Sequence, residues 1–149
     1  MIHIQELYSM VLWSEEYLIG IREIDKQHKK FVELAKPLFE ADEELSREEI
    51  RELLYALREY MKFHFEDEEK YMKKVSFPEL DEHILQHKRL VDELALVVQT
   101  PAKLPVIQSK IKVIVKKFVK HIRDEDHKIK LFIESSEYAT QTQEEIFEL

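Results

Sequence analysis

The stretch LDEHILQHKRLVDELALVV, residues 80–98, has the apolar periodicity of an amphipathic helix. Every third or fourth residue belongs to one stripe, and two of the stripe residues are histidines. The stripe consists of Leu80, His83, His87, Leu90, Leu94 and Val97. Because His83 and His87 are four residues apart, both side chains leave the same face of the helix and can reach one metal ion.

Three further segments show the same periodicity: one over about residues 20–41, one from Ser46, and one after the break at 99–105. Each of their stripes carries at least one histidine. The stripes are Ile24, His28, Phe31, Ala35 and Leu38; Ile50, Leu54, Leu57, Met61, His64, Glu68 and Tyr71; and Ile107, Ile111, Ile114, Phe118 and His121.

Four amphipathic segments with short connections predict an all-α protein, an up-down-up-down four-helix bundle in one domain over residues 1–149. The bundle is expected over about residues 20–134. An N-terminal arm of about residues 1–19 precedes it. A C-terminal segment of about residues 135–149 follows, and its residues 137–149 are expected to form a short helix.

Three positions predict how helices begin or end. Pro37 removes a backbone hydrogen bond inside the first segment, which predicts a kink or an early end there. Ser46 with Glu49 three residues later is a capping-box pattern at the start of the second helix. Pro78 is expected in the first turn of the third helix.

The composition excludes several classes of site. The chain has 149 residues, one Gly, 36% charged residues and a net charge of −8, which favours long helices with polar outer faces. It has no cysteine, so disulfides, thiolate zinc sites, iron–sulfur clusters and cysteine nucleophiles are excluded. Any bound metal must therefore have nitrogen and oxygen ligands.

The charge pattern predicts neither a nucleic-acid-binding nor a membrane protein. The segment KIKVIVKKFVKHIR, residues 110–123, is basic, but its apolar residues recur at helical spacing, so we interpret its lysines as the solvated face of a helix. No apolar run is long enough to span a bilayer. The N-terminal sequence MIHIQELYSMVLWSEE lacks the basic and apolar regions of a signal peptide, so a cytoplasmic protein is expected.

Five of the seven histidines lie on the four stripes, together with Glu68. A single histidine on an apolar face is usually a hydrogen-bonded core residue. A cluster of five with a buried carboxylate would leave several polar groups unpaired, at about 1–3 kcal/mol each, unless a metal binds them. We therefore predict a metal site, with His3 and His127 outside it.

Five imidazoles exceed what one ion with an open position can use, so two ions bridged by carboxylates fit better. Glu68 is one bridge, and the second is expected from HIRDED, residues 121–126. Regular helical periodicity favours Glu125, four residues after His121. Asp126, at five residues, requires a π-type turn. Periodicity alone leaves both residues possible.

The chain resembles the hemerythrins and is most similar to the stand-alone bacterial members. The matching stretches are WSEEYLIGIREIDKQH (13–28), HFEDEE (64–69), HILQH (83–87) and HIRDED (121–126). The resemblance implies two iron ions with a bridging oxo or hydroxo group. It implies His83, His87 and His121 as ligands of one iron, His28 and His64 as ligands of the other, and Glu68 and Asp126 as bridges.

The resemblance also implies a function. With one position open at the two-histidine iron, the expected activity is reversible O2 binding for oxygen transport, storage or delivery, by a protein that is not an enzyme. O2, or nitric oxide, is then the expected partner, and a monomer is favoured. The alternatives are a di-iron redox enzyme, an O2 or nitric oxide sensor with the same site, and a metal-storage or structural bundle.

Four residues are candidates for the ligand pocket: Phe31, Lys117, Phe118 and Ile122. Ordinary core packing explains the apolar three equally well. Many relatives have an aromatic residue at the position of Lys117, which either extends outward or reaches the pocket. Trp13 and Tyr17 are expected to pack the arm over the bundle.

Overall fold

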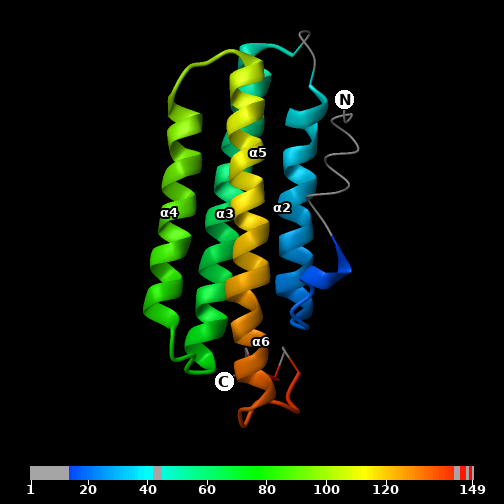
Figure 1. The fold of residues 1–149 in the computed structure, drawn as a ribbon, viewed down its shortest axis with the longest axis vertical. Coiled ribbons are helices and arrows are strands. Elements are labelled where there is room, and N and C mark those ends of the chain that lie inside the picture. Colours follow the sequence, from blue (N-terminus) through cyan, green and yellow to red (C-terminus); the bar gives the residue numbers. More distant parts are fainter. Residues whose placement is uncertain (1–13, 42–44, 143–144, 147, 149) are drawn as a thin grey trace.

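Four long helices form the body of the molecule in the computed structural model, which describes residues 14–41, 45–142, 145–146 and 148. They run alternately in opposite directions (Figure 1). No strand occurs among these described residues. The helices are α2 (Arg22–Glu40), α3 (Arg47–Lys74), α4 (Leu80–Gln99) and α5 (Leu104–His121). The prediction of an all-α four-helix bundle is confirmed.

The last helix of the bundle continues beyond α5 without a break. A π-helical turn, η2 (Ile122–Asp126), follows directly and leads into α6 (His127–Glu134). At the other end of the chain, the short 3₁₀ helix η1 (Glu15–Tyr17) precedes α2. The predicted terminal helix is wrong at residues 137–140, which form turns, whereas residues 145–146 are helical. Residues 143–144, 147 and 149 lie outside the described part of the chain.

The start of α3 has the predicted cap. The Ser46 hydroxyl accepts a hydrogen bond from the Glu49 backbone N–H at 3.1 Å. This bond satisfies one of the amide groups that have no partner within the first turn of a helix. Pro78, in contrast, lies in the turn that precedes α4, two residues before the helix begins. Its predicted place in the first helical turn is therefore wrong.

Pro37 does not end α2 early, because the helix continues to Glu40. The proline deprives the Glu33 carbonyl of its usual donor, and only three residues of α2 follow Pro37. A side chain from α5 then closes this end. The Gln108 amide donates to the carbonyls of Leu38 at 2.9 Å and Ala41 at 3.1 Å.

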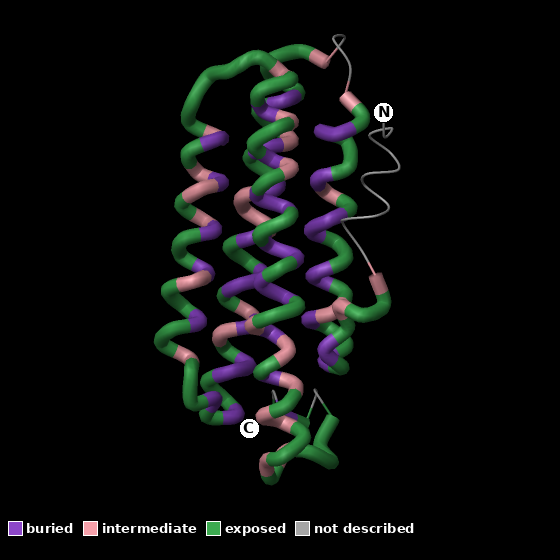
Figure 2. The backbone as a smooth tube through the Cα atoms, in the orientation of Figure 1, coloured by how far each residue is buried: buried purple, intermediate pink, exposed green. Residues whose placement is uncertain are grey.

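The predicted stripes face the interior, where Figure 2 shows the buried residues on the inner sides of the helices. Every stripe residue is buried except Leu80, which is half-buried. Because neighbouring helices are antiparallel, the end of α2 lies beside the start of α3, and the end of α4 beside the start of α5. Only apolar stripe residues occupy this half of the core. The histidines and carboxylates occupy the other half.

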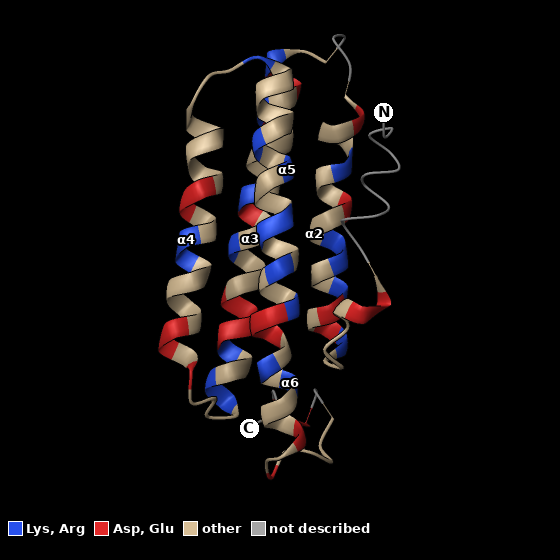
Figure 3. Ribbon diagram, viewed as in Figure 1, with Lys and Arg blue, Asp and Glu red and all other residues tan. Residues whose placement is uncertain are grey.

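The outer faces of the helices carry the charged residues (Figure 3). No described helix combines the length and the apolar character needed to cross a membrane.

Asp25 joins the N-terminal segment to α2. Its carboxylate accepts hydrogen bonds from the backbone N–H groups of Ile19 at 2.8 Å and Gly20 at 3.1 Å. Gly20 has a φ of +83°, a conformation that is costly for residues with a Cβ atom. The predicted packing of Trp13 falls outside the described residues, whereas Tyr17 is half-buried in η1.

We expect Ser46→Ala to lower the free energy of unfolding by about 1 kcal/mol, because the Glu49 amide loses its acceptor. Urea unfolding followed by circular dichroism measures the change. The matched control is Ser109→Ala, at an exposed position inside α5, which should change stability by less than about 0.5 kcal/mol. Equal effects of the two substitutions would contradict the capping role.

Candidate metal centre

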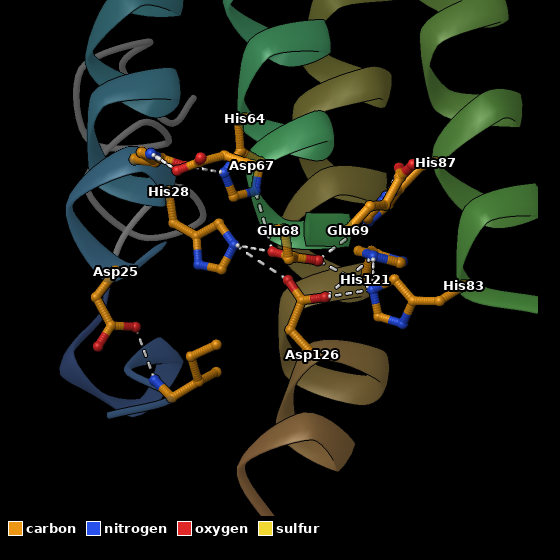
Figure 4. A network of polar contacts seen from close by, with 12 residues as sticks. Asp25, His28, His64, Asp67, Glu68, Glu69, His83, His87, His121 and Asp126 are labelled. Atoms are coloured by element: carbon orange, nitrogen blue, oxygen red, sulfur yellow. Dashed lines mark hydrogen bonds and ion pairs between the residues drawn. The ribbon is translucent and has the colours of Figure 1, made fainter. Parts of the chain in front are cut away.

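Seven side chains from all four bundle helices and η2 converge in one half of the core (Figure 4). Each is at most 7% exposed, although all are polar or charged. They are His28 from α2, His64 and Glu68 from α3, His83 and His87 from α4, His121 from α5, and Asp126 from η2. The structure thus brings together all seven predicted ligands, while their role as ligands stays a prediction.

Helix geometry explains how four of the seven reach the centre. His64 and Glu68 are four residues apart on α3, and His83 and His87 are four apart on α4. In an α-helix such pairs lie one above the other on the same face. The same face of each helix also carries its apolar stripe, so packing of the bundle directs both pairs inward.

The π-helical turn selects Asp126 over Glu125. In η2 the His127 backbone N–H donates to the Ile122 carbonyl, five residues back, so the turn holds one residue more than an α-helical turn. Asp126 is consequently aligned with His121 and is fully buried. Glu125 is only partly buried and forms an ion pair with Lys128 at 3.0 Å. Of the two carboxylates that periodicity left possible, only Asp126 faces the cluster.

The two carboxylate oxygens of Glu68 contact different histidines. Oε2 lies 3.3 Å from Nε2 of His28 and 3.2 Å from Nε2 of His64. Oε1 lies 3.0 Å from Nε2 of His83 and 3.1 Å from Nε2 of His87. One carboxylate thus connects the histidines of α2 and α3 to those of α4.

Asp126 connects the same two groups from the opposite helix. Its Oδ1 lies 2.8 Å from Nε2 of His83 and 3.2 Å from Nε2 of His121. Its Oδ2 lies 3.1 Å from Nε2 of His28. The cluster is therefore a pair of histidine groups, one of three and one of two, joined by two carboxylates.

The unsatisfied atoms of the cluster fit metal binding. Nε2 of His64, Nε2 of His87 and Oδ2 of Asp126 are buried and make no well-aligned hydrogen bond, although charged or polar atoms lie 3.1–3.2 Å from each. The Nε2 atoms of His83 and His121 lie 3.1 Å apart. Two donor atoms that bind one ion at about 2.1 Å and at right angles are separated by about 3 Å. Imidazole and carboxylate together suit first-row transition metals, including iron.

The charges within the metal-free cluster are strongly coupled. Burial lowers the pKa of His28, but its contacts with Asp126 and Glu68 outweigh burial and raise the pKa to about 9. The same balance raises the pKa of His83 to about 10. Burial and the neighbouring charge of His28 lower the pKa of His64. Although burial opposes it, the surrounding histidines hold the pKa of Glu68 well below its usual range.

Two residues that the sequence analysis did not assign, Gln27 and Glu69, orient two histidine rings of the cluster. Nδ1 of His64 lies 2.8 Å from Oε1 of Gln27, whose amide in turn donates to Asp67 at 2.8 Å. Nδ1 of His87 lies 2.7 Å from Oε2 of Glu69. A hydrogen bond at Nδ1 fixes the proton there and leaves the Nε2 lone pair directed at the centre.

The sequence contained only an indirect signal for these two residues. Gln27 directly precedes His28, and Glu69 directly follows Glu68. A neighbour in a helix is rotated by about 100° from the stripe, toward an adjacent helix. Which ring it meets there depends on the packing of that helix, so spacing alone could not find these contacts.

Aromatic side chains cover the two-histidine side of the centre. The Phe118 ring lies 5.8 Å from the rings of both His28 and His64, and 4.2 Å from the Phe31 ring. Phe31, Phe118 and Ile122 are fully buried. On the three-histidine side, Phe65 stacks on His87, with the ring centres 3.8 Å apart.

Lys117 does not line this region, which corrects its prediction as a pocket residue. Its side chain is 50% exposed, and its ammonium forms an ion pair with Glu93 of α4 at 2.8 Å. Position 117 lies on the outer side of α5, directly before buried Phe118. The long side chain therefore extends to water, the outward alternative considered above.

Comparison with known proteins agrees with this geometry. The family described as Hemerythrin HHE cation binding domain matches residues 19–132. This chain belongs to the hemerythrin family. Membership implies a site for non-heme iron, and the sequence resemblance is confirmed.

Several curated hemerythrins are similar over much of their length. A bacteriohemerythrin of Clostridium acetobutylicum is 30% identical over 92 residues, which cover 57% of this chain and 69% of the relative. A bacteriohemerythrin of Campylobacter jejuni is 28% identical over 114 residues, which cover 74% of this chain and 86% of the relative. A myohemerythrin of Theromyzon tessulatum is 30% identical over 118 residues, which cover 79% of this chain and 89% of the relative. No solved structure gives a significant match.

Exchange of adjacent carboxylates tests which one this hemerythrin uses. Asp126→Asn should weaken iron binding about tenfold or more, because a buried anionic ligand is lost. Glu125→Gln is the matched control and should leave iron content unchanged, since Glu125 pairs with Lys128. Iron analysis after gel filtration measures both. Loss of iron from the Glu125 variant alone would contradict the assignment.

Iron binding should release protons. With pKa values of about 9 and 10, His28 and His83 are protonated at pH 7 in the metal-free protein, and an imidazolium nitrogen cannot bind a metal. Binding of iron(II) at pH 7 should release at least two protons, one each from His28 and His83, to which a hydroxo bridge formed from water adds another, and affinity should rise with pH up to about pH 10. An anaerobic titration with a pH indicator measures the release. His127→Gln should release the same number, and pH-independent affinity would contradict the expectation.

Proposed function

We propose that this hemerythrin binds O2 reversibly at a non-heme, carboxylate-bridged di-iron centre and serves in oxygen transport, storage or delivery. The observation that carries the proposal is the unequal division of the histidines. Three histidines lie on one side of the two carboxylates and two lie on the other. An ion on the two-histidine side has one protein ligand fewer, which leaves a position for a small molecule.

The proposed ligand sets follow the contacts described above. His83, His87 and His121 hold one iron, and His28 and His64 hold the other. Glu68 and Asp126 bridge the pair, together with an oxo or hydroxo group from solvent. The support for this assignment is that each carboxylate presents one oxygen to each histidine group, at 2.8–3.3 Å from the ring nitrogens.

When bound, the iron pair supplies the electrons that hold O2 reversibly. The chain's own residues keep water and proton donors away from the open position. Phe31, Phe118 and Ile122 are fully buried, and Phe118 contacts both rings of the two-histidine side. Lys117, on the same helix, directs its ammonium outward to Glu93. A dry, apolar environment favours release of O2 over its reduction.

The proposed role is binding rather than catalysis. Oxygen-activating di-iron enzymes of the ferritin type use Glu-x-x-His motifs in a carboxylate-rich set. This chain offers five imidazoles and two carboxylates. Turnover with peroxide or nitric oxide would instead favour a redox enzyme, and binding of nitric oxide without binding of O2 would favour a nitric oxide sensor.

The test is the visible absorption spectrum of the reduced, iron-loaded protein under argon, in air, and under argon again. We expect charge-transfer bands that appear with air and disappear on purging. Bands that decay at once to a stable oxidised form would indicate redox chemistry, and iron-loaded protein without any oxygen-dependent band would refute O2 binding. As a control, Lys117→Leu should keep the bands and their reversibility, because that side chain points away from the site.

A further inference from the structure

The charge of the chain is distributed very unevenly. Residues 94–123 contain none of the 31 Asp and Glu residues and seven of the 23 Lys and Arg residues. The other 119 residues, with 16 basic and 31 acidic residues, therefore carry a net charge of −15. Most of the acid-free segment is α5, the helix that provides His121.

The exposed residues of α5 recur every three or four positions, so most of them lie along one side of the helix, and Figure 3 shows separate stretches of Lys and Arg along α5. Two exposed valines, Val106 at 45% and Val113 at 49%, lie among the basic residues. The surface is about 26 Å long at 1.5 Å per residue. We call it the α5 face; it consists of Val106, Ser109, Lys110, Val113, Lys116, Lys117, Lys120 and Arg123.

Three lysines of the α5 face have no direct partner in the described part of the chain. Lys117 pairs with Glu93, and Arg123 pairs with Asp124. Lys110 and Lys116 form no ion pair with any described residue. Lys120 has the charge of Asp124 nearby but makes no direct contact with it. These three ammonium groups can therefore meet carboxylates of another molecule without breaking an existing pair.

The helix that carries the α5 face also carries His121, the most exposed residue of the metal centre. His121 is 7% exposed, whereas the other six residues of the centre are at most 2% exposed. Lys120 directly precedes His121, and Lys117 is one turn before it. His121 therefore connects the surface with the centre through a single side chain.

We propose that the α5 face is the docking site for an acidic one-electron carrier protein, which reduces the oxidised centre through His121. This inference rests on the proposed di-iron function, because O2 can bind only to the reduced ions. Each reduced carrier gives up one electron and each ferric ion gains one, so two carriers are oxidised per chain.

The rest of the molecule favours a protein over a larger polyanion as the partner. A membrane surface or a nucleic acid would also face the residues that carry the net charge of −15, which repel it. A small protein can contact the α5 face alone. Exposed valines among lysines suit a small, transient redox interface that is steered by charge.

The first test is the rate at which a reduced, acidic plant-type [2Fe–2S] ferredoxin reduces the oxidised, iron-loaded chain. The rate should fall between ionic strengths of about 0.1 M and 1 M, where the Debye length shortens from about 10 Å to 3 Å and the charges of the α5 face itself are screened. The combined variant Lys110→Glu, Lys116→Glu and Lys120→Glu should lower the second-order rate constant about tenfold or more at an ionic strength of about 0.1 M.

The matched control is Lys62→Glu, Lys70→Glu and Lys73→Glu, which makes the same charge change at exposed positions of α3. This variant should react at nearly the wild-type rate. An equal loss in both variants would show that net charge alone matters and would overturn the proposal, as would no loss in either. Reduction by a small uncharged reductant should be the same in all three proteins, and circular dichroism should confirm that each is folded.

A second readout does not require iron. Carbodiimide should cross-link the metal-free chain to ferredoxin through Lys110, Lys116 or Lys120, as located by mass spectrometry. Cross-links confined to other lysines would overturn the proposal, as would tighter binding of anionic vesicles or duplex DNA than of ferredoxin. Cross-links on the α5 face in a protein without an oxygen-dependent band would refute the O2 function and leave the docking surface intact.

Discussion

Two carboxylates, Glu68 and Asp126, are buried completely inside a helical core, and the rest of the site is arranged around them. Buried anions without compensation are very unfavourable. Here five imidazoles from four helices surround them at 2.8–3.3 Å. In the metal-free protein, raised pKa values keep His28 and His83 protonated, which neutralises the two negative charges. Metal ions in the same place would replace those protons, so either protons or metal ions can compensate the charges of the two buried carboxylates.

The two halves of the bundle divide the tasks of stability and chemistry. One half contains only apolar stripe residues, which supply the hydrophobic stabilisation that a polar cluster cannot. The other half contains the cluster of five histidines and two carboxylates, with Phe31 and Phe118 packed against its two-histidine side. Gln27 and Glu69 orient the rings of His64 and His87, because their hydrogen bonds fix the proton of each ring on Nδ1.

The charge on the outside of the bundle differs between α5 and the rest of the chain. α5 carries His121 on its inner face and an acid-free row of lysines on its outer face, whereas the rest of the chain is strongly acidic. One helix thus connects the interior centre to the surface best suited to an acidic partner. Lys117 belongs to this outer row, which explains how a lysine next to buried Phe118 leaves the pocket apolar.

Hydrophobic periodicity and the spacing of the histidines were enough to predict the bundle, its four inward stripes and six of the seven residues of the centre. Apolar residues at steps of three and four, in a chain with only one glycine, indicate amphipathic helices and not strands. The seventh residue was ambiguous, because regular periodicity favours Glu125 and only the resemblance to hemerythrins pointed to Asp126. Tertiary structure decided it through the π-helical turn, where packing aligns residues five apart. Packing also decided the course of α2 past Pro37, the outward course of Lys117 and the contacts of Gln27 and Glu69. Each of these depends on what a neighbouring helix presents, and that information is not contained in local spacing.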